Sequence, residues 1–442
     1  MTTRLDETDL PKWLRQRLLA AGGSVPFRTF MAWALHDPDH GAYGSGRLVI
    51  GRRGDFVTSP SLGPDFAALL APQLAEWLAE LAAGMGLDLE GAAGTQQAAK
   101  ARPRPLALVE TGPGEGELAL QLAQALAQDW PQLAACCELV LVEPNGGMAA
   151  RQRQRLEASP LPCRWVRAEA LAQSPRTGVV LAHEVLDALA VERIRWDGRH
   201  WRQQRVALSQ EAGRPKCLGF VDGDRLDPEA EPALESLGLW PPDPRREPGW
   251  TTELHPEMAP WLATCAAGIS RGRLLVIDYA HSAERYYAPQ RQGGTLMAYR
   301  QQEASGDPLR QPGSWDLTAH LCSDSLVRAA RQGGWHLLGQ RSQGEALLAL
   351  GLAQRLHGLQ TPAAGEQLDL ATALGRRESL LRLVDPAGLG AFRWFAFSRD
   401  GAPAALVAEE RPESGQHSGQ AQPPGSQHPG DDPPLPLFLR DP

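Results

Sequence analysis

The stretch at residues 106–126 contains the first residues whose spacing points to chemistry. The apolar run 106–110 ends in Glu110, and a turn with a glycine at every second position separates it from a helical pattern. Glycines that follow a buried strand let a ligand approach the backbone closely, and a helix N-terminus beyond them favours a negative group. We therefore expect a ligand site at this turn. Its residues are Gly112, Pro113, Gly114 and Gly116.

The spacing of the glycines separates two kinds of ligand. A dinucleotide fingerprint, GxGxxG, needs a third glycine at position 117, where this chain has Glu117. A carboxylate at Glu110 would repel a pyrophosphate, but it suits an ammonium group with a sulfonium nearby. The pattern E-x-G-x-G-x-G is similar to motif I of S-adenosylmethionine-dependent methyltransferases, in which the glycine turn packs against the amino-acid and ribose part of the cofactor.

A second acid strengthens the prediction of a nucleoside site. Glu143 ends the next apolar run, 138–143. A carboxylate fixed at a strand end accepts hydrogen bonds only, so Glu143 is suited to accept both hydroxyls of a ribose. A strand-terminal glutamate is often only a solvated end, so the prediction rests on Glu143, Glu110 and the glycines together.

Other polar residues gather at the ends of apolar runs or in irregular segments. Each group has a structural alternative, such as a helix cap, a satisfied core histidine or a turn closed by its own hydroxyls. The loop at 51–63 contributes Thr58 and Ser59, and the run 178–186 leads into His183, Glu184 and Asp187. Asp278 and His281 follow the run 273–279, and Asp316 and His320 stand four residues apart, on one face if that stretch is helical.

Apolar runs alternate with helical patterns across the middle of the chain. Continuous apolar strands that alternate with helices predict an α/β fold with a mostly parallel, doubly wound sheet. The predicted strands are 106–110, 138–143, 178–186, 273–279, 335–343 and 392–398, and the predicted helices are 117–128, 147–157, 345–357 and 375–383.

Composition shifts divide the chain into six segments. Residues 1–83 form a helical region with a polar loop, and 84–104 read as a low-complexity insertion. The segment 201–264 is an inserted lobe that separates the two halves of the core, 105–200 and 265–410. Residues 411–442, rich in Pro, Gly, Gln and Ser, cannot bury enough apolar surface to fold, so we expect a disordered tail.

Charge and cysteine usage exclude several functions. The formal net charge is −8, without the basic face of a nucleic-acid binder. The six cysteines have no metal-like spacing, and Asp187 stands where an HExxH zinc motif needs histidine. We therefore predict no metal site and reduced thiols. No apolar run is long enough to span a membrane, and the acidic N-terminus resembles neither a signal nor a transit peptide, so we predict a cytoplasmic protein.

Seven motifs in order make the sequence similar to the MidA-type family of class I methyltransferases. They are GDFVTSPSLG, VETGPGEGELA, LVEPN, AHEVLDALAV, LLVIDYAH, GTLMAY and PGSWDLTAH. The resemblance spans about residues 25–350. It implies a Rossmann-like fold with a mostly parallel, seven-stranded sheet, an N-terminal helical region and an inserted lobe. Its mitochondrial member methylates an arginine of a respiratory complex I subunit during assembly.

The resemblance implies a function and a set of roles. The chain would transfer a methyl group from S-adenosylmethionine to an arginine of a protein, such as a subunit of a respiratory-type NADH dehydrogenase, and it could form a homodimer. Glu184 and Asp187 would clamp the guanidinium, and His183 would position it or accept its proton. The cofactor would contact Glu110, the glycine turn, Glu143, Thr58 and Ser59, and the substrate would contact the residues at 278, 281, 316 and 320.

Two departures from the family pattern keep an alternative open. Ser61 replaces a usual glutamate, and Ala190 replaces a usual proline, both beside the expected substrate site. The alternative is an assembly chaperone that binds the cofactor and a partner protein but transfers little or no methyl. An NAD-dependent oxidoreductase is disfavoured by Glu110 and Glu117.

Overall fold

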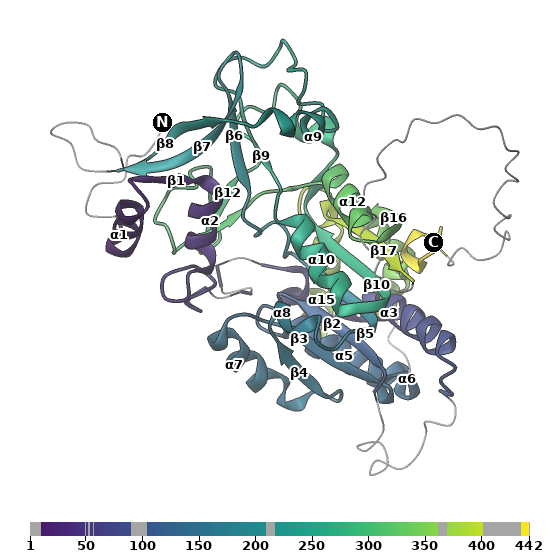
Figure 1. Cartoon of the computed structure of the whole chain (residues 1–442). Coiled ribbons are helices and arrows are strands. Elements are labelled where there is room, and N and C mark those ends of the chain that lie inside the picture. Colours follow the sequence, from purple (N-terminus) through teal and green to yellow (C-terminus); the bar gives the residue numbers. More distant parts are fainter. Residues whose placement is uncertain are drawn as a thin grey trace, which may run out of the picture.

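Two sheets organise the computed structural model of the chain, and they lie in different parts of the molecule (Figure 1). The structure describes residues 10–48, 50–51, 54–55, 57–89, 104–208, 217–360, 369–400 and 435–441. Within these residues, no helix is both long and apolar enough to cross a membrane.

The larger sheet has seven strands, and its neighbours are parallel except where β17 pairs with β10 and β16. This arrangement confirms the predicted mostly parallel sheet. In spatial order the strands are β16 (His336–Ser342), β17 (Arg393–Arg399), β10 (Ile269–Asp278), β5 (Arg176–His183), β2 (Leu106–Thr111), β3 (Cys137–Val142) and β4 (Cys163–Val166).

Helices cover both faces of this sheet, which explains why its central strands are apolar along their whole length. On β2, Leu106 and Leu108 pack into one core cluster, while Ala107 and Val109 pack into the opposite one. The first cluster receives α3 (Asp65–Gly84), α5 (Glu117–Asp129), α6 (Pro131–Ala135), α13 (Gln343–Ala349), α14 (Leu352–Gln360) and α15 (Leu370–Leu383). The second receives α8 (Ala168–Leu171), α10 (Met258–Gly268) and α12 (Ser323–Gln332).

The second sheet is antiparallel and forms the core of the inserted lobe. It consists of β1 (Ser24–Pro26), β7 (Trp201–Leu208), β6 (Glu192–Trp196), β9 (Thr251–Leu254) and β8 (Leu218–Arg225). Helices α1 (Lys12–Ala20) and α2 (Phe27–His36) pack with this lobe and with a small sheet of β12 (Met297–Arg300), β13 (Glu303–Ser305) and β14 (Asp316–Thr318). Short elements complete the chain: α7 (Gly146–Arg155), α9 (Glu231–Glu235), α11 (Ala283–Tyr286), β11 (Ala280–His281) and β15 (Leu321–Cys322).

The lobe differs from its predicted bounds. It begins at β6, before residue 201, because β6 and β7 form a hairpin whose strands must stay together. The predicted region 1–83 is shared between the two parts of the molecule: β1 pairs with β7 of the lobe, whereas α3 packs on the large sheet. The edge strand β4 had no counterpart among our predicted strands, because it has only four residues and is half-buried.

The last residues of the chain correct the prediction of a tail without structure. Residues 401–434 lie outside the described part, as do 90–103 of the predicted insertion, but 435–441 dock against the large domain. Phe438 is fully buried against Trp77 and Trp394, and its N–H donates to Gln73 (3.1 Å). A buried aromatic anchor, together with hydrogen bonds from Arg341 to the carbonyls of Phe438 and Arg440, thus fixes a segment whose composition otherwise predicts disorder.

Candidate active site

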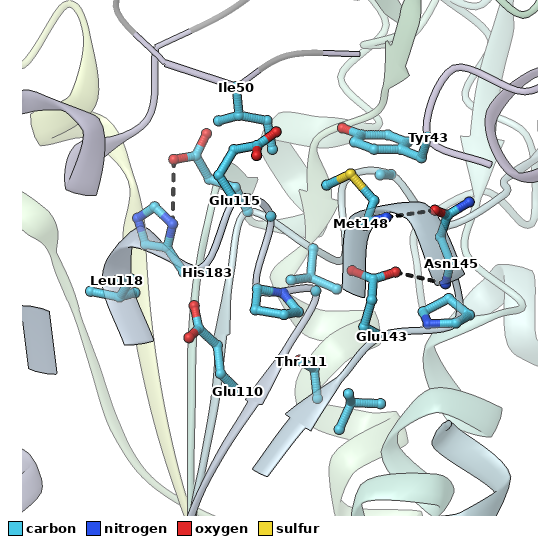
Figure 2. Close-up of a pocket in the computed structure, with 18 of the residues that line it drawn as sticks. Tyr43, Ile50, Glu110, Thr111, Glu115, Leu118, Glu143, Asn145, Met148 and His183 are labelled. Carbon is cyan, nitrogen blue, oxygen red and sulfur yellow. Dashed lines mark hydrogen bonds and ion pairs between the residues drawn. The ribbon is translucent and has the colours of Figure 1, made fainter. Parts of the chain in front are cut away.

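A cavity of about 1240 Å³ opens at the carboxyl ends of β2, β3 and β5. Residues from the first 61 positions of the chain form part of its wall, so the N-terminal segment covers strand ends that belong to the large sheet. Figure 2 shows Glu110, Glu143 and His183 at its base, with Tyr43 and Ile50 on the opposite side. A ligand beyond the carboxyl ends of parallel strands is the general arrangement of doubly wound sheets.

The glycine turn lines this cavity and requires its glycines. Gly114 has φ +51° and Gly116, which precedes α5, has φ +78°, a left-handed region that side chains rarely adopt. A Cβ on Gly114 would also lie 2.9 Å from Cδ1 of Ile50 on the covering segment. The turn can therefore approach a ligand in a way that no other residue type would permit.

Glu110 supplies a buried carboxylate at the base of the cavity. Its side chain is 5% exposed, and its Oε2 has no hydrogen-bond partner among the described residues. Burial raises the pKa of Glu110 to about 8. A cationic group in the cavity would satisfy this oxygen and lower the pKa again. This fits the ammonium group predicted from the sequence.

Glu143 is held in place by two donors. Its Oε1 accepts from the N–H of Asn145 (2.8 Å) and its Oε2 from the side chain of Gln152 (2.9 Å). Burial raises its pKa, while these two hydrogen bonds oppose the shift. A carboxylate has about four acceptor positions, so Glu143 retains capacity for the hydroxyls of a ribose.

The sequence analysis missed Gln152, whose side chain links three groups on the cofactor side of the cavity by hydrogen bonds. Its side chain is fully buried and donates both to Glu143 and to the carbonyl of Gly114 (2.8 Å), while its Oε1 accepts from Trp165 (3.0 Å). The available signal was its position on α7, where it shares the buried face with Met148 and Ala149. A glutamine on the apolar face of a helix indicates a polar partner inside.

Hydrogen bonds attach the covering segment to the cofactor side. The side chain of Asn145 donates to the carbonyl of Gly44. Arg151 donates to the carbonyl of Gly46 (3.0 Å) and forms an ion pair with Glu115 (3.1 Å) in the glycine turn. The cavity is therefore closed on one side by contacts between segments about 100 residues apart in the sequence.

Thr58 and Ser59, predicted together as cofactor contacts, face different ways. Thr58 lines the cavity and caps the short helix η2 (Ser59–Leu62) in a reciprocal arrangement with Ser61. The Ser59 hydroxyl instead accepts from Gln343 (3.2 Å) and is fully buried outside the cavity lining. The prediction for the Ser59 side chain therefore needs correction, because a helical turn sends successive side chains in different directions.

Three acids meet beside the cavity at the other end of the site. Glu184 lines the cavity, and Asp187 and Asp316 are buried close enough for each to affect the ionisation of the next. Burial raises the pKa of Asp187 to about 7 and that of Asp316 to about 8, and it raises the pKa of Glu184 well above its usual value. Tyr43 forms a hydrogen bond with Asp316.

No cation offsets the charge of this acid cluster, defined here as Glu184, Asp187 and Asp316. Among the residues that the structure describes, no Lys or Arg is a principal influence on the pKa of any of the three. Oε1 of Glu184 and Oδ1 of Asp316 are buried without a hydrogen-bond partner. Buried acids are normally paired, and none of the described residues pairs with this cluster through a positive charge.

Glu184 carries backbone strain of a kind found at functional sites. Its φ is +53°, although it is not glycine, and its N–H donates to the carbonyl of Ile277 (2.9 Å). His183, the residue before it, lies with Nδ1 3.5 Å from Oε1 of Glu184. Burial lowers the pKa of His183 to about 3, so its ring is neutral near pH 7 and has a free Nε2.

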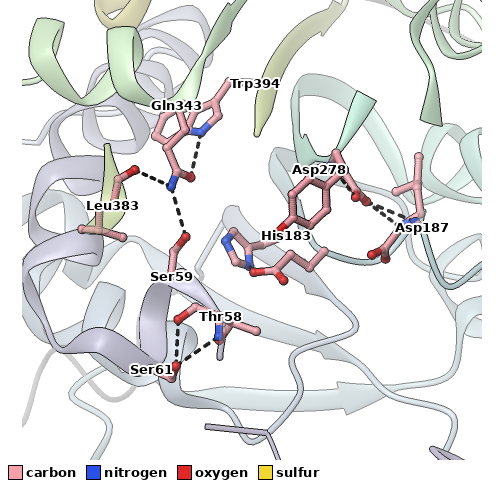
Figure 3. A network of polar contacts seen from close by, with 12 residues as sticks. Thr58, Ser59, Ser61, His183, Asp187, Asp278, Gln343, Leu383 and Trp394 are labelled. Carbon is pink, nitrogen blue, oxygen red and sulfur yellow. Dashed lines mark hydrogen bonds and ion pairs between the residues drawn. The ribbon is translucent and has the colours of Figure 1, made fainter. Parts of the chain in front are cut away.

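Asp278 is buried behind the site and does not lie at its opening. It is fully buried and accepts from the N–H groups of Leu186 (3.0 Å) and Asp187 (3.2 Å), as Figure 3 shows for Asp187. The expectation of a direct substrate contact is therefore corrected, because the backbone occupies its oxygens. Asp278 instead fixes the turn that carries Glu184 and Asp187.

His281 and His320 contact each other, with 3.2 Å between Nε2 of His281 and Nδ1 of His320. Neither lines the large cavity. Burial lowers both pKa values to about 4. The condition for a shared helical face of Asp316 and His320 is not met, because Asp316 begins strand β14 and His320 follows it. Asp316 reaches the acid cluster because β14 pairs with β12, not because of a helical spacing.

The site and fold together define a class of protein. A glycine turn, two strand-end acids and a large cavity at the carboxyl edge of a mostly parallel sheet fit a nucleoside cofactor with a cationic group. The described residues contain no group of three His, Cys, Asp or Glu side chains placed to hold a metal ion. The arrangement is that of an enzyme or binding protein that uses such a cofactor.

Comparison with known proteins assigns the family. A model of an S-adenosyl-L-methionine-dependent methyltransferase family matches residues 91–341, more than half of the chain, and the chain belongs to this family. A crystal structure of a Burkholderia thailandensis protein bound to S-adenosyl-homocysteine is 31% identical, with a TM-score of 0.71, and the match covers 90% of this chain and 94% of that one.

Relatives with named functions are similar over most of their length. "Protein arginine methyltransferase NDUFAF7 homolog, mitochondrial" of Drosophila melanogaster is 29% identical, covering 86% of this chain and 82% of the relative. The NDUFAF7 proteins of Rattus norvegicus and Homo sapiens are 27% and 25% identical, and carry the same methyltransferase name. These relatives are all named mitochondrial, which contradicts our prediction of a cytoplasmic location.

Proposed function

We propose that this chain transfers a methyl group from S-adenosylmethionine to an arginine side chain of a protein. The observation that carries the proposal is the acid cluster beside the cofactor cavity, which has no cation of its own among the described residues. A guanidinium is planar, remains charged and matches carboxylates bidentately, so it is the cation that such a cluster suits best. The relatives named protein arginine methyltransferase support this choice.

The size of the cavity supports two occupants. Ligand pockets are commonly about 300–1,000 Å³, and this cavity of about 1240 Å³ exceeds that range. Glu110 and the glycine turn would hold the methionine end of the cofactor, and Glu143 would hold its ribose. The remaining space leads to Glu184. The cofactor supplies a methyl group on a sulfonium, which is transferred by in-line displacement.

The chain's residues would then align the acceptor and manage one proton. Glu184 and Asp187 would hold the guanidinium with one nitrogen directed at the methyl group, and alignment of this kind is the main contribution an enzyme makes to such a reaction. The new N–CH₃ bond replaces the S–CH₃ bond, and the nitrogen gives up a proton. Glu184, whose pKa burial raises well above its usual value, is placed to take it, and the neutral His183 ring positions this carboxylate from 3.5 Å away.

Two finer points belong to the same proposal. The strand order β4-β3-β2-β5-β10-β17-β16, with β17 antiparallel, is the order we assign to a Rossmann-like class I methyltransferase. The acceptor protein that we propose is a subunit of a respiratory-type NADH dehydrogenase, which is what the family resemblance implies.

Transfer of labelled methyl tests the proposal. Tritiated S-adenosylmethionine is incubated with the protein and an extract from a strain that lacks its gene, and the proteins are separated. We expect one labelled band with wild type and with Glu229→Gln, a control at an exposed position, and none with Glu184→Gln. Acid hydrolysis should release the label as methylarginine.

The same experiment identifies the alternative. Cofactor binding by calorimetry with no labelled band would refute the proposed transfer and favour an assembly chaperone that binds the cofactor. Label that hydrolysis releases as methyllysine or methylglutamate would refute the choice of arginine.

A further inference from the structure

Gln343 is a buried polar residue that takes no part in the reaction described above. It is fully buried at the start of α13, beside β17 and the end of α15. Its side-chain nitrogen donates to the Ser59 hydroxyl (3.2 Å) and to the carbonyl of Leu383 (3.0 Å), and its oxygen accepts from the indole of Trp394 (3.3 Å). Figure 3 shows Gln343 bridging these three partners.

The contact with Ser59 leads from Gln343 to the active site. Ser59 lies between Thr58 and Pro60, which line the cavity together with Glu184, and its backbone N–H is close enough to the Glu184 carboxylate to lower the pKa of that acid. One residue therefore presents its hydroxyl to Gln343 and its backbone to the acid at the base of the cavity. In the short helix that begins at Ser59, the carbonyl of Pro60 also accepts a hydrogen bond from the side-chain amide of Gln121. At 3.4 Å this hydrogen bond is long and weak. Gln343 is the better-placed anchor of this turn.

Glu184 needs such an anchor because little else orients its side chain. Its backbone is in the left-handed region, its Oε1 has no hydrogen-bond partner, and its neighbours Asp187 and Asp316 repel it when charged. A strained residue keeps its conformation only when its surroundings over-determine it. Asp278 fixes the turn after Glu184, and the groups that face the carboxylate itself are the Ser59 N–H and the His183 ring, whose Nδ1 lies 3.5 Å from Oε1.

We propose that Gln343 is a positioning residue for methyl transfer. It holds Ser59 through a hydrogen bond, so that the Ser59 N–H aims the Glu184 carboxylate at the acceptor guanidinium. Gln343 touches neither the cofactor nor the acceptor. The inference rests on the proposed function only in its last step, because the link from Gln343 through Ser59 to Glu184 exists whatever the acceptor is.

Hydrogen exchange of the Ser59 amide tests the structural link without any acceptor. Gln343→Met removes the hydrogen bonds with little change of shape, and Ser59→Ala removes the same hydroxyl contact from the other side. Gln73→Met is the matched control, because Gln73 is equally buried but bonds to Phe438 and Glu76 instead. We expect amide exchange at residue 59 to be at least tenfold faster in Gln343→Met and in Ser59→Ala, and to be unchanged in Gln73→Met.

Kinetics test the effect on transfer. For Gln343→Met and Ser59→Ala we expect kcat to fall about tenfold, with the Kd for S-adenosylmethionine within twofold of wild type, because the cofactor contacts lie elsewhere. The double variant should lose no more than the worse single variant, since both changes break one link. A merely structural role for Gln343 would instead lower Tm and leave kcat intact, as we expect for Gln73→Met.

The outcomes separate the two ideas. Unchanged exchange at Ser59 in both variants overturns the positioning role, and so does faster exchange with kcat equal to wild type. Additive losses of kcat in the double variant also overturn it, because the two residues would then act independently. No methyl transfer by wild-type protein refutes the proposed function, and the exchange experiment still decides whether Gln343 holds Ser59.

Discussion

The carboxylates at the two ends of the cavity differ in their hydrogen-bond and ion-pair partners. At the cofactor end, Glu143 is held by Asn145 and Gln152, and Glu115 is paired with Arg151. At the acceptor end, Glu184, Asp187 and Asp316 crowd together without a cationic partner among the described residues. The first end is organised before its ligand arrives, whereas the second depends on its ligand to become electrostatically satisfied.

This difference indicates how the two ligands are bound. A preorganised ribose site needs little change to bind a cofactor that is always the same. An uncompensated acid cluster, by contrast, discriminates strongly, because only a cation of the right shape relieves it. Glu110 is the exception at the cofactor end, since its Oε2 also lacks a partner among the described residues, and we propose that it faces the part of the cofactor that carries a positive charge.

The largest effect is expected from the glycine turn. Gly114→Val should reduce cofactor affinity at least 100-fold, because valine is strained at φ +51° and its side chain would collide with Ile50. Gly375→Ala is the control, since a Cβ there meets no atom within 4 Å and Gly375 does not line the cavity. Calorimetric titration with S-adenosylmethionine measures both. Wild-type affinity in Gly114→Val would mean that the cofactor does not bind along this turn.

Changes in the acid cluster should separate the two ends. Asp187→Asn should lower kcat/KM for the acceptor protein roughly 10–100-fold, as the loss of a charged hydrogen bond implies, while the Kd for the cofactor stays within twofold. Initial rates and calorimetry on the same preparation test this. If cofactor affinity falls as much as kcat/KM, the two ends are not independent and the comparison fails.

Gln152→Leu should weaken the cofactor end by a smaller amount. Leucine leaves Glu143, the Gly114 carbonyl and the Trp165 indole without a shared partner. The loss of one such network should cost about 1–2 kcal/mol, or roughly 5–30-fold in cofactor affinity. The kcat at saturating cofactor should remain near that of wild type. A large drop in kcat would show that Gln152 also serves the acceptor end.

The pH dependence should report on the acceptor end. In the free protein the pKa of Asp187 is about 7 and that of Asp316 about 8, so the cluster gains charge as pH rises through this range. We expect kcat/KM for the acceptor to rise several-fold between pH 6 and pH 8, since it reports on the free enzyme. Asp316→Asn should shift the midpoint of the rise to lower pH. A flat profile would contradict the uncompensated cluster.

The smallest effect concerns stability. The pKa of Asp316 is higher in the folded protein than its ordinary value of 3.8, so the folded state holds this proton more tightly. Its contribution to stability is therefore present at low pH and is lost as pH rises toward 8. Asp316→Asn keeps the site neutral and should raise Tm by about 2 °C at pH 8. A lower Tm than wild type at pH 8 would indicate that Asp316 has a cationic partner.

The sequence predicted the cofactor end better than the acceptor end, for a physical reason. Glu110, the glycines and Glu143 belong to contiguous strand–turn–helix units, so local pattern places them. The acid cluster joins Glu184 to Asp316, which reaches it through pairing of β12 with β14, and no local periodicity reveals such a contact. Gln152 and Gln343 were missed because the position of a glutamine on a buried helix face indicates a polar partner but does not say which one.

The fold shows the same contrast. Six of the seven strands of the large sheet were predicted, because both faces of the sheet are covered and its central strands are therefore apolar along their length. The lobe boundary and the docked segment at 435–441 were not, since a single residue such as Phe438, or a strand as short as β1, decides them. Pairings between distant short segments depend on the assembled structure rather than on local composition.

Mass spectrometry of methylated arginines tests the central claim most directly. Proteins from a strain that lacks the gene are compared with those of its parent and of the strain restored with wild type or with Glu184→Gln. We predict one arginine site that is methylated in the parent, unmethylated in the deletion, and restored by wild type but not by Glu184→Gln. Identical arginine methylation in all four strains would contradict the account.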